Sequence, residues 1–306
     1  MFDTIIIGAG PAGFTSGIYA ARREMKTMII AKEPGGQVAL ASKIENYPGF
    51  KSIGSYDLIT KMQEQVKALG VKIKIDEVKK IEKQNDDSFV LHTTKEKYRG
   101  KTIIIAMGLS PRRLAIQGED EFNGKGVSYC ANCDGPFYKN KTVAVVGGGN
   151  AALDAAEVMS KIAKKVYLAH RREEFRGFEI LLDKVAEKEN IKFLLNTEVK
   201  EIIGKERVEK IKVYNNKTKK EKKIKLDGVF VEVGRVAHTD FVADFVERDK
   251  KDQIIVGQNC ETKTSGIFAA GDVVVGDFKQ ITIAMGQATI AALAAYQYLQ
   301  LKREEL

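Results

Sequence analysis

Residues 4–13, Thr-Ile-Ile-Ile-Gly-Ala-Gly-Pro-Ala-Gly, join a β-branched run to a glycine-rich turn near the N-terminus. The run predicts a buried strand, and the residues up to about Arg22 predict a helix. Gly8, Gly10 and Gly13 fit the G-x-G-x-x-G pattern. In that pattern the first glycine permits a tight turn, the second lets the backbone approach a pyrophosphate, and the third lets the helix pack closely on the strand. With a second β-rich run at 27–31, the segment predicts a β-α-β unit that binds a dinucleotide.

The same pattern returns in the middle of the chain. A β-branched run at 142–146 leads into Gly147-Gly148-Gly149-Asn150-Ala151-Ala152, an Ala-rich helix through about Ala163 and a strand at 165–169. This second turn reads G-x-G-x-x-A, with alanine as the third small residue. The duplication predicts two dinucleotide-binding units in one chain.

The residues after the second strand differ between the two units. In the first unit, Glu33 follows the second strand. It is a candidate acceptor for a ribose hydroxyl, the alternative being a surface acid in a turn. The second unit has His170-Arg171-Arg172-Glu173-Glu174-Phe175-Arg176 there. Arginine matches a 2′-phosphate in a bidentate manner, whereas a carboxylate would repel it. The cluster therefore favours NADP over NAD, the alternative being a basic surface patch offset by two glutamates.

Cys130 and Cys133 form a C-x-x-C pair followed by Asp134. Zinc is disfavoured because structural zinc needs about four ligands and the three histidines show no ligand spacing. A redox dithiol fits better, since C-x-x-C spacing allows an intramolecular disulfide and lowers a thiol pKa. Asp134 could move a proton for the departing thiolate. The remaining cysteine, Cys260, is expected to be a packed structural thiol.

Composition excludes several classes. The 306 residues are 44% hydrophobic and 30% charged, as in globular proteins, and 50 Lys and Arg against 41 Asp and Glu give a formal net charge of +9. The basic residues are interleaved with acids, which predicts a solvated surface and no nucleic-acid partner. We expect neither a signal peptide nor a membrane span, and hence a cytoplasmic protein.

Other segments complete the expected α/β pattern. Loop residues are expected at 45–49, helices at 56–69, 180–188 and 281–301, and strands at 89–93 and 102–106. The segment 267–272 is expected to end a late strand at a Gly-Asp corner. Strands at 208–214 and 222–226 are expected to pair, with 215–221 as a solvated basic hairpin tip. Two nucleotide sites and one dithiol together suggest a relay from NADPH through a flavin to the dithiol.

Several motifs now resemble a known family. Residues 8–13, 35–37, 45–49, 130–138, 147–152, 170–176 and 271–272 occur in order and together resemble low-molecular-weight thioredoxin reductases. The resemblance implies a homodimer of two Rossmann-like three-layer α/β domains, the second inserted into the first. It assigns 1–112 and 240–306 to an FAD-binding domain and 113–239 to an NADPH-binding domain that carries the dithiol and rotates between half-reactions.

The resemblance also implies roles for individual residues. Cys133 would lie next to the flavin, Cys130 would exchange with thioredoxin or a related small dithiol protein, and Asp134 would be the general acid. Asp272 would touch the ribityl chain and Gln280 would lie near the flavin ring. The expected FAD-binding residues are Gly8, Gly10, Pro11, Ala12, Gly13, Glu33, Gly36, Gln37, Asn46, Gly108, Gly271, Asp272, Lys279, Gln280 and Ile281. The expected NADPH-binding residues are Gly147, Gly149, Asn150, Ala151, Ala152, His170, Arg171, Arg172 and Arg176.

Some positions depart from the family pattern. Met107 stands where threonine is common, 234–238 lacks the usual Pro-Asn, and Lys279-Gln280-Ile281 replaces Arg-Gln-Ala. The last change, and Cys-Asp-Gly-Pro after the dithiol, also resemble the flavoprotein subunit of alkyl hydroperoxide reductase. A glutaredoxin-like or peroxiredoxin-linked partner is therefore the alternative to thioredoxin.

Three further readings are disfavoured. A ferredoxin–NADP reductase-like enzyme would have no use for the dithiol. A thioredoxin reductase that does not use NADPH would not need the arginine cluster. A non-catalytic nucleotide sensor would not need the dithiol or Asp134.

Overall fold

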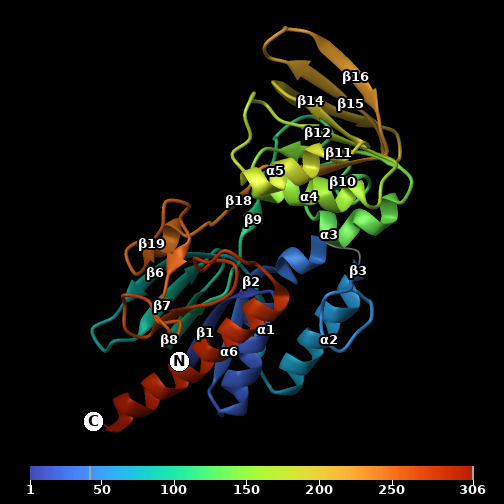
Figure 1. Ribbon diagram of the computed structural model, residues 1–306. Coiled ribbons are helices and arrows are strands. Elements are labelled where there is room, and N and C mark those ends of the chain that lie inside the picture. Colours follow the sequence, from blue (N-terminus) through green and yellow to red (C-terminus); the bar gives the residue numbers. More distant parts are fainter. Residues whose placement is uncertain (41–42, 305–306) are drawn as a thin grey trace. The chain divides into compact units, whose positions relative to one another are not determined.

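The computed structural model describes residues 1–40 and 43–304 and contains two compact units. The first unit consists of Met1–Ala39, Ile44–Ser110 and Val236–Leu306, and the second contains Pro111–Arg235. The second unit is thus inserted in the sequence of the first, so the blue and red ends of the chain in Figure 1 belong to one unit.

The first unit is built on a mixed sheet. Its helices and strands are β1 (Phe2–Ala9), α1 (Pro11–Arg22), β2 (Thr27–Pro34), the 3-10 helix η1 (Gly36–Leu40), β3 (Lys43–Ile44), β4 (Ile53–Gly54), α2 (Ser55–Ala68), β5 (Lys72–Ile75), β6 (Val78–Lys83), β7 (Phe89–Thr93), β8 (Lys97–Ile105), the 3-10 helix η3 (Asp240–Val242), β19 (Glu247–Arg248), β20 (Ile254–Ile255), β21 (Ile267–Ala269) and α6 (Ile281–Glu304). The strand order is β5-β2-β1-β8-β7-β6, and β21 also pairs with β8. Strands β5, β2, β1, β8 and β21 are parallel, whereas β7 is antiparallel to both β8 and β6.

Alternating isoleucines place this sheet between two layers. Ile5 and Ile7 belong to a core cluster with Phe89, Leu91 and the segment that includes Val242 and Val246. The opposite face is covered by helices: α1 packs on β1, and α6 packs on α1, β8 and β21 (Figure 1). Ser16 in α1 donates a hydrogen bond to the Ala288 carbonyl of α6 (3.2 Å), which joins the two helices. The unit is therefore a three-layer α/β fold.

The second unit has the same plan in smaller form. Its elements are β10 (Val127–Ser128), α3 (Ala131–Asp134), the 3-10 helix η2 (Gly135–Tyr138), β11 (Thr142–Gly147), α4 (Asn150–Ser160), β12 (Lys165–Ala169), α5 (Glu179–Ala186), β13 (Ile191–Leu194), β14 (Thr197–Gly204), β15 (Val208–Asn215), β16 (Glu221–Lys225) and β17 (Gly228–Glu232). A parallel sheet of order β10-β17-β11-β12-β13 forms its centre.

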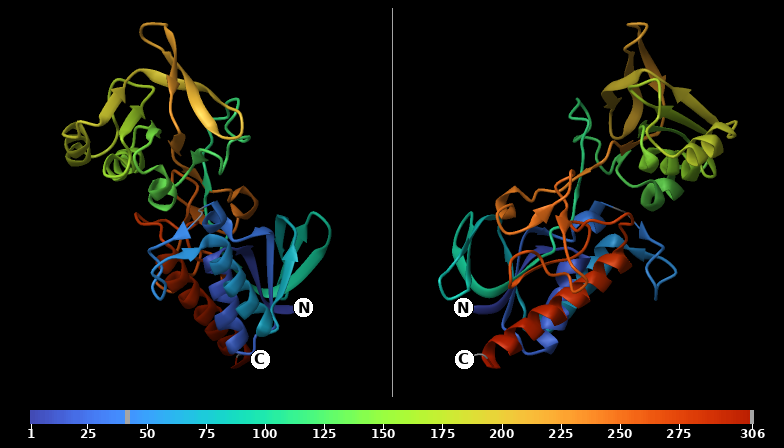
Figure 2. Two further views of the ribbon diagram at one scale, coloured as in Figure 1. Left: turned by 90° about the vertical axis from the view of Figure 1, so that its right-hand side faces the viewer. Right: turned by 60° about the vertical axis from the view of Figure 1, so that its left-hand side comes forward.

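Two faces of this sheet are covered differently. Val143, Val145 and Leu168 pack on α4 and α5, while Ala144 and Val146 pack on the antiparallel sheet β14-β15-β16. Figure 2 shows β14–β16 as a long ribbon that extends beyond the parallel sheet of its own unit. The predicted fold class, two Rossmann-like three-layer α/β domains, is confirmed.

Two short strands mark the connections between the units. Strand β9 (Ser110–Pro111) pairs with β18 (Arg235–Val236), and the Arg112 amide donates to the Gly234 carbonyl (2.9 Å). The two segments that connect the units in sequence are therefore hydrogen-bonded to each other. Within the described residues, no helix combines the length and apolar character needed to cross a bilayer.

Most predicted elements are present, with one clear difference. The helix after the second glycine turn ends at Ser160 rather than near Ala163. The side-chain amide of Asn190 donates to the carbonyls of Ser160 (2.8 Å), the last residue of the helix, and of Ala163 (3.1 Å). Such a side-chain donor satisfies carbonyls at a helix end that lack partners within the helix.

Candidate functional site

The carboxyl ends of parallel strands gather the predicted FAD-binding residues in the first unit. Gly35, after β2, donates its amide to the Ala9 carbonyl at the end of β1 (2.7 Å). A Cβ atom on Gly271, after β21, would lie 2.9 Å from the Cβ of Ala12 at the start of α1. Ligands of open α/β sheets bind at this edge.

The three glycines of the first turn are required for different reasons. Gly8 has φ +116°, and a Cβ there would lie 2.3 Å from the Ala106 carbonyl oxygen. A Cβ on Gly13 would lie 1.8 Å from the carbonyl oxygen of Gly8. Gly10 is different, because its φ is −89° and a Cβ there would come no closer than 3.8 Å to the described protein atoms around it. The protein itself tolerates a side chain at Gly10, so the missing Cβ leaves a cradle for a ligand.

This cradle suits a pyrophosphate. Helix α1 begins with Pro11 directly after Gly10, and its first turn carries no acidic residue. A helix N-terminus presents free N–H groups and a partial positive charge, which favour phosphate. The residues present therefore fit the diphosphate of FAD, and their assignment to FAD stays a prediction.

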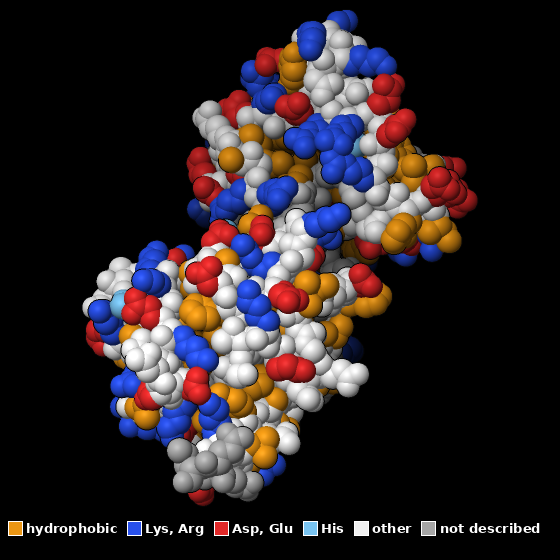
Figure 3. Space-filling view, turned by 90° about the vertical axis from the view of Figure 1, so that its left-hand side faces the viewer, with side chains coloured by type: hydrophobic (Ala, Val, Ile, Leu, Met, Phe, Trp, Pro, Cys, Tyr) orange, Lys and Arg blue, Asp and Glu red, His pale blue; other side chains and the backbone are white. Residues whose placement is uncertain are grey.

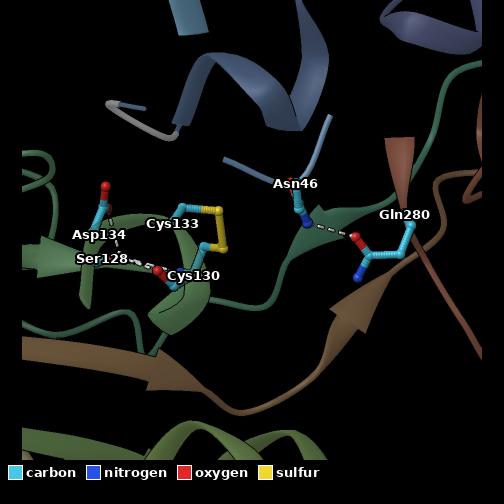
Figure 4. The surroundings of a disulfide bond; sticks show 6 residues. All are labelled: Asn46, Ser128, Cys130, Cys133, Asp134 and Gln280. Carbon is cyan, nitrogen blue, oxygen red and sulfur yellow. Dashed lines mark hydrogen bonds between the residues drawn. A yellow bond between two sulfur atoms is a disulfide. The ribbon is translucent and has the colours of Figure 1, made fainter. Parts of the chain in front are cut away.

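Other predicted FAD-binding residues form hydrogen-bonded pairs within the first unit. Gln37 Nε2 donates to Asp272 Oδ2 (2.9 Å), and Asn46 Nδ2 donates to Gln280 Oε1 (3.1 Å), the pair drawn in Figure 4. Lys279 donates to the Val274 carbonyl. Burial lowers the pKa of Lys279, although the nearby Asp272 carboxylate acts in the opposite direction.

The remaining predicted FAD-binding residues lie at the ends of secondary-structure elements. Glu33 is exposed in β2, and Gly36 begins η1. Gly108 follows β8 with φ +67°, and Ile281 begins α6.

The second glycine turn repeats this geometry between β11 and α4. A Cβ on Gly147 would lie 2.3 Å from the Glu232 carbonyl oxygen, whereas Gly149 has no described atom within 4 Å of such a position. Asn150, Ala151 and Ala152 form the first turn of α4, which also lacks an acidic residue. Here too the helix N-terminus and the open middle glycine fit a pyrophosphate.

His170 lies beneath this turn rather than at its surface. A Cβ on Gly148 would lie 2.1 Å from the imidazole ring, which is stacked on Phe175 with centroids 5.0 Å apart. Nε2 of His170 contacts the Glu174 carbonyl oxygen (3.0 Å). Burial lowers the pKa of His170, and the neighbouring arginines lower it further. A neutral, buried ring of this kind supports the turn.

The three arginines extend from the loop around that ring. Arg171, Arg172 and Arg176 have exposed side chains, and Figure 3 shows Lys and Arg side chains gathered on the second unit. The Arg176 amide donates to the Gly148 carbonyl (2.7 Å) and holds the loop against the glycine turn. Asn150 Oδ1 accepts from the Phe178 amide (2.8 Å), so its side chain holds the end of the same loop.

Cys130 and Cys133 are joined by a disulfide around α3, as Figure 4 shows. Both cysteines are half-buried. Ser128 Oγ donates to Asp134 Oδ2 (2.7 Å) and accepts from the Cys130 amide (3.1 Å). The carboxylate of Asp134 is therefore tied by one hydroxyl to the backbone that carries Cys130. Sequence reasoning missed Ser128, because a serine in a short strand carries no distinguishing signal.

Glu232 was also missed, although a charged residue ending the apolar run Val-Phe-Val was a usable signal. It ends β17, directly opposite Gly147 of β11. The pKa of Glu232 is raised to about 7, chiefly by burial and in part by Asp154, while Arg235 and the Ala131 amide act to lower it. Its carboxyl therefore faces the first residue of the dithiol helix from the edge that carries the glycine turn.

Cys260 is the buried thiol that the sequence predicts. It is free, and its Sγ donates to the Gln287 carbonyl at 3.4 Å. Burial raises its pKa to about 11. Among the described residues, no group of three or more His, Cys, Asp and Glu side chains is arranged to hold a metal ion.

Known proteins share this sequence and architecture. The family model for pyridine nucleotide-disulphide oxidoreductases matches residues 2–288. A "34.2 kDa protein in rubredoxin operon" from Clostridium pasteurianum is 39% identical over 300 residues, covering 97% of each chain. A thioredoxin reductase from Listeria innocua is 37% identical over 308 residues, covering 100% of this chain and 96% of the relative. The crystal structure of thioredoxin reductase from Streptococcus pyogenes matches with TM-score 0.87, 39% identity and 98% coverage of both chains.

Members of the matched family use FAD and a pyridine nucleotide to exchange electrons with a disulfide. Two glycine turns with open middle positions and one C-x-x-C disulfide are the features that such an enzyme requires. With the family model matching nearly its whole length, the chain belongs to the pyridine nucleotide-disulphide oxidoreductase family.

Proposed function

We propose that this protein is an NADPH-dependent thioredoxin reductase with a Cys130–Cys133 redox centre. The observation that carries the proposal is the disulfide within the unit that also holds the arginine-flanked glycine turn. Full-length relatives named thioredoxin reductase support it.

Each unit is assigned one cofactor. Residues 1–112 and 240–306 would bind FAD, and 113–239 would bind NADPH. FAD supplies the chemistry that couples a two-electron hydride donor to a disulfide. Gly10 and Gly149 would let the two pyrophosphates approach the helix N-termini of α1 and α4. Arg171 and Arg172 would recognise the 2′-phosphate that distinguishes NADPH.

The reduced dithiol would act by thiol–disulfide exchange. The Cys130 thiolate attacks one sulfur of the thioredoxin disulfide, forms a mixed disulfide and displaces the other sulfur as a thiolate. Cys133 then attacks Cys130, which restores the Cys130–Cys133 disulfide and releases reduced thioredoxin. Asp134, oriented by Ser128, would donate a proton to the departing thiolate.

Three further properties belong to the proposal. The dithiol-bearing domain would rotate between half-reactions, with β9 and β18 as its two connections. The protein would act as a homodimer in the cytoplasm. Light scattering of the FAD-loaded protein tests the dimer, which requires twice the chain mass.

A second partner class is favoured by specific residues. Pro136 after Cys-Asp-Gly and the Lys279-Gln280-Ile281 sequence also resemble the flavoprotein subunit of alkyl hydroperoxide reductase. A glutaredoxin-like or peroxiredoxin-linked protein is therefore the alternative disulfide substrate.

The deciding experiment measures NADPH oxidation by the FAD-loaded protein with and without thioredoxin from the same source. Fast thioredoxin-dependent oxidation that is lost in Cys130→Ser is expected. If NADPH bleaches the flavin but thioredoxin does not reoxidise it, the partner assignment is wrong and the electron relay stands. Retained activity in a variant with both Cys130 and Cys133 changed to Ser would contradict the dithiol mechanism.

Trapping separates the roles of the two cysteines. Cys133→Ser leaves Cys130 free and is expected to accumulate a mixed disulfide with the partner on non-reducing gels. Accumulation in Cys130→Ser alone would reverse the assignment.

A further inference from the structure

Three consecutive carbonyl groups of the arginine loop are hydrogen-bonded from outside the loop. The carbonyls of His170 and Arg172 accept from the backbone amides of Thr197 (2.8 Å) and Asn196 (3.0 Å). The carbonyl of Arg171 instead accepts from a side chain, Nδ2 of Asn216, at 2.7 Å. Asn216 is therefore a side chain that fixes the backbone from which Arg171 extends.

Asn216 lies in the tip of the β15–β16 hairpin, and the tip is well ordered by its own hydrogen bonds. Asn215 Oδ1 accepts from the amides of Lys217 (3.1 Å) and Thr218 (2.8 Å). The Asn216 amide donates to the Asn196 carbonyl (2.7 Å). The backbone on both sides of the contact is therefore fixed by other hydrogen bonds. The Asn216 side chain reaches the arginine loop from a tip that is already ordered.

The next residue of the tip acts on the charge of the same loop. Lys217 Nζ lies 2.9 and 3.2 Å from the two carboxylate oxygens of Glu173, which directly follows Arg172. The side chains of Lys217 and Glu173 are 63% and 64% exposed, and exposed ion pairs contribute little to folding stability. The pair matters instead for an anion bound by the arginines. Without Lys217, the negative charge of Glu173 would repel that anion.

We propose that the hairpin tip completes the 2′-phosphate site of this protein, an inference that rests on the proposed NADPH function. Asn216 is a positioning residue that holds the Arg171 backbone, and Lys217 neutralises Glu173 beside the phosphate. The group that these residues recognise is a ribose 2′-phosphate. Binding of an adenosine nucleotide that lacks this phosphate should not depend on Asn216 or Lys217. The basic tip, expected from the sequence to be only a solvated turn, thereby acquires a role in coenzyme selection.

Binding of two small probes to the FAD-loaded full chain tests the role of Asn216. Calorimetry measures the dissociation constants of 2′,5′-ADP and of 5′-AMP, which differ by the 2′-phosphate. Asn216→Ala is expected to weaken 2′,5′-ADP by about three- to tenfold and 5′-AMP by less than about twofold, because one positioning hydrogen bond is lost. In turnover, the NADPH KM should rise while kcat and the NADH KM stay unchanged.

Lys217 is tested by charge. Lys217→Glu should weaken 2′,5′-ADP by about tenfold at low salt, and the defect should shrink at high salt because exposed charges are screened. Lys217→Arg should restore wild-type binding, since arginine can still pair with Glu173. Lys220→Ala, a lysine in the same hairpin, is the matched control and should change neither probe.

The outcomes separate this inference from the proposed function. If Arg171→Ala with Arg172→Ala leaves the ratio of the two probe affinities unchanged, the NADPH site itself is wrong. A second outcome is that the arginine variant reduces the preference for 2′,5′-ADP over 5′-AMP while Asn216→Ala and Lys217→Glu leave that preference unchanged. In that case only the role of the tip is overturned. Equal weakening of both probes by Asn216→Ala would indicate general damage to the unit and would also overturn it.

Discussion

The two glycine turns have the same geometry at two positions and differ at the third. In both, a Cβ on the first glycine would lie 2.3 Å from the carbonyl oxygen of a neighbouring strand end, that of Ala106 for Gly8 and that of Glu232 for Gly147. In both, the middle glycine is open toward the protein. The third residue is Gly13 in one turn, where a Cβ would be 1.8 Å from a backbone oxygen, and a buried Ala152 in the other.

The difference separates two reasons for a glycine. The first glycine of each turn and Gly13 are constrained by the protein's own backbone, so their substitution should damage folding. The middle positions, Gly10 and Gly149, have φ values of −89° and −106°, which any residue adopts. Their small size therefore serves a ligand, and their substitution should damage binding.

Gly13→Ala should have the largest effect. The added methyl group would meet the Gly8 carbonyl, and relieving that contact requires a backbone shift that costs at least about 3 kcal/mol. Ala152→Gly, the matched change in the other turn, should cost only about 1 kcal/mol, chiefly through helix propensity. Urea unfolding of the two variants measures both, and similar costs would contradict the distinction between the turns.

Glu232→Gln should have the next largest effect, and it depends on pH. Burial raises the pKa of Glu232 from 4.5 to about 7, so the folded protein binds this proton more tightly than the unfolded chain. That contribution to stability is complete below about pH 4.5 and is lost as the pH rises through about 7. At pH 8 the glutamine variant should be more stable than the wild type by about 2–3 kcal/mol, against little difference at pH 5. A pH-independent difference in unfolding free energy would show that the carboxyl is ionised throughout.

Replacing Arg171 and Arg172 with Ala tests whether the second turn is specialised for a phosphorylated ribose. Loss of the charge-assisted contacts should raise the NADPH KM by about 10- to 100-fold and leave the NADH KM nearly unchanged. Steady-state kinetics with both coenzymes gives the answer. An equal rise for both would place the cluster outside the 2′-phosphate site.

Gly149→Ala should change stability least, by less than about 1 kcal/mol, because the backbone is extended and the space is open. NADPH binding should nevertheless weaken strongly, as a methyl group would occupy the cradle. Gly10→Ala should behave in the same way toward flavin content. Wild-type NADPH binding by Gly149→Ala, or wild-type flavin content in Gly10→Ala, would contradict the ligand-based explanation of that middle glycine.

Local patterns were enough to predict the elements that carry the turns. Strand β12, Lys165–Ala169, and strand β7, Phe89–Thr93, have the predicted bounds. The hairpin turn lies within the predicted tract 215–221, whose first and last residues belong to β15 and β16. The sequence also indicated the disulfide, since C-x-x-C spacing places two thiols within reach of one another.

Non-local pairing explains what was missed. Strand β17 lies inside its sheet, between β10 and β11, but its partner β11 precedes it by about 80 residues. Five residues with no turn signal beyond the first glycine do not reveal such a strand. The hydrogen bond between Asn216 and Arg171 spans 45 residues and connects two segments that each look like exposed polar loops. The position of Glu232 at the end of an apolar run was a usable local signal, but its raised pKa arises only in the folded unit.

The buried Cys260 has a practical consequence for reading the oxidation state of the enzyme. Aromatic disulfide reagents react with thiolates, and a thiol with a pKa of about 11 is ionised to about one part in a thousand at pH 8. Cys260 should therefore stay silent in the native protein, while Cys130 and Cys133 each add one equivalent of colour after reduction. A count of reactive thiols before denaturation would thus report the redox centre directly, with no cysteine removed.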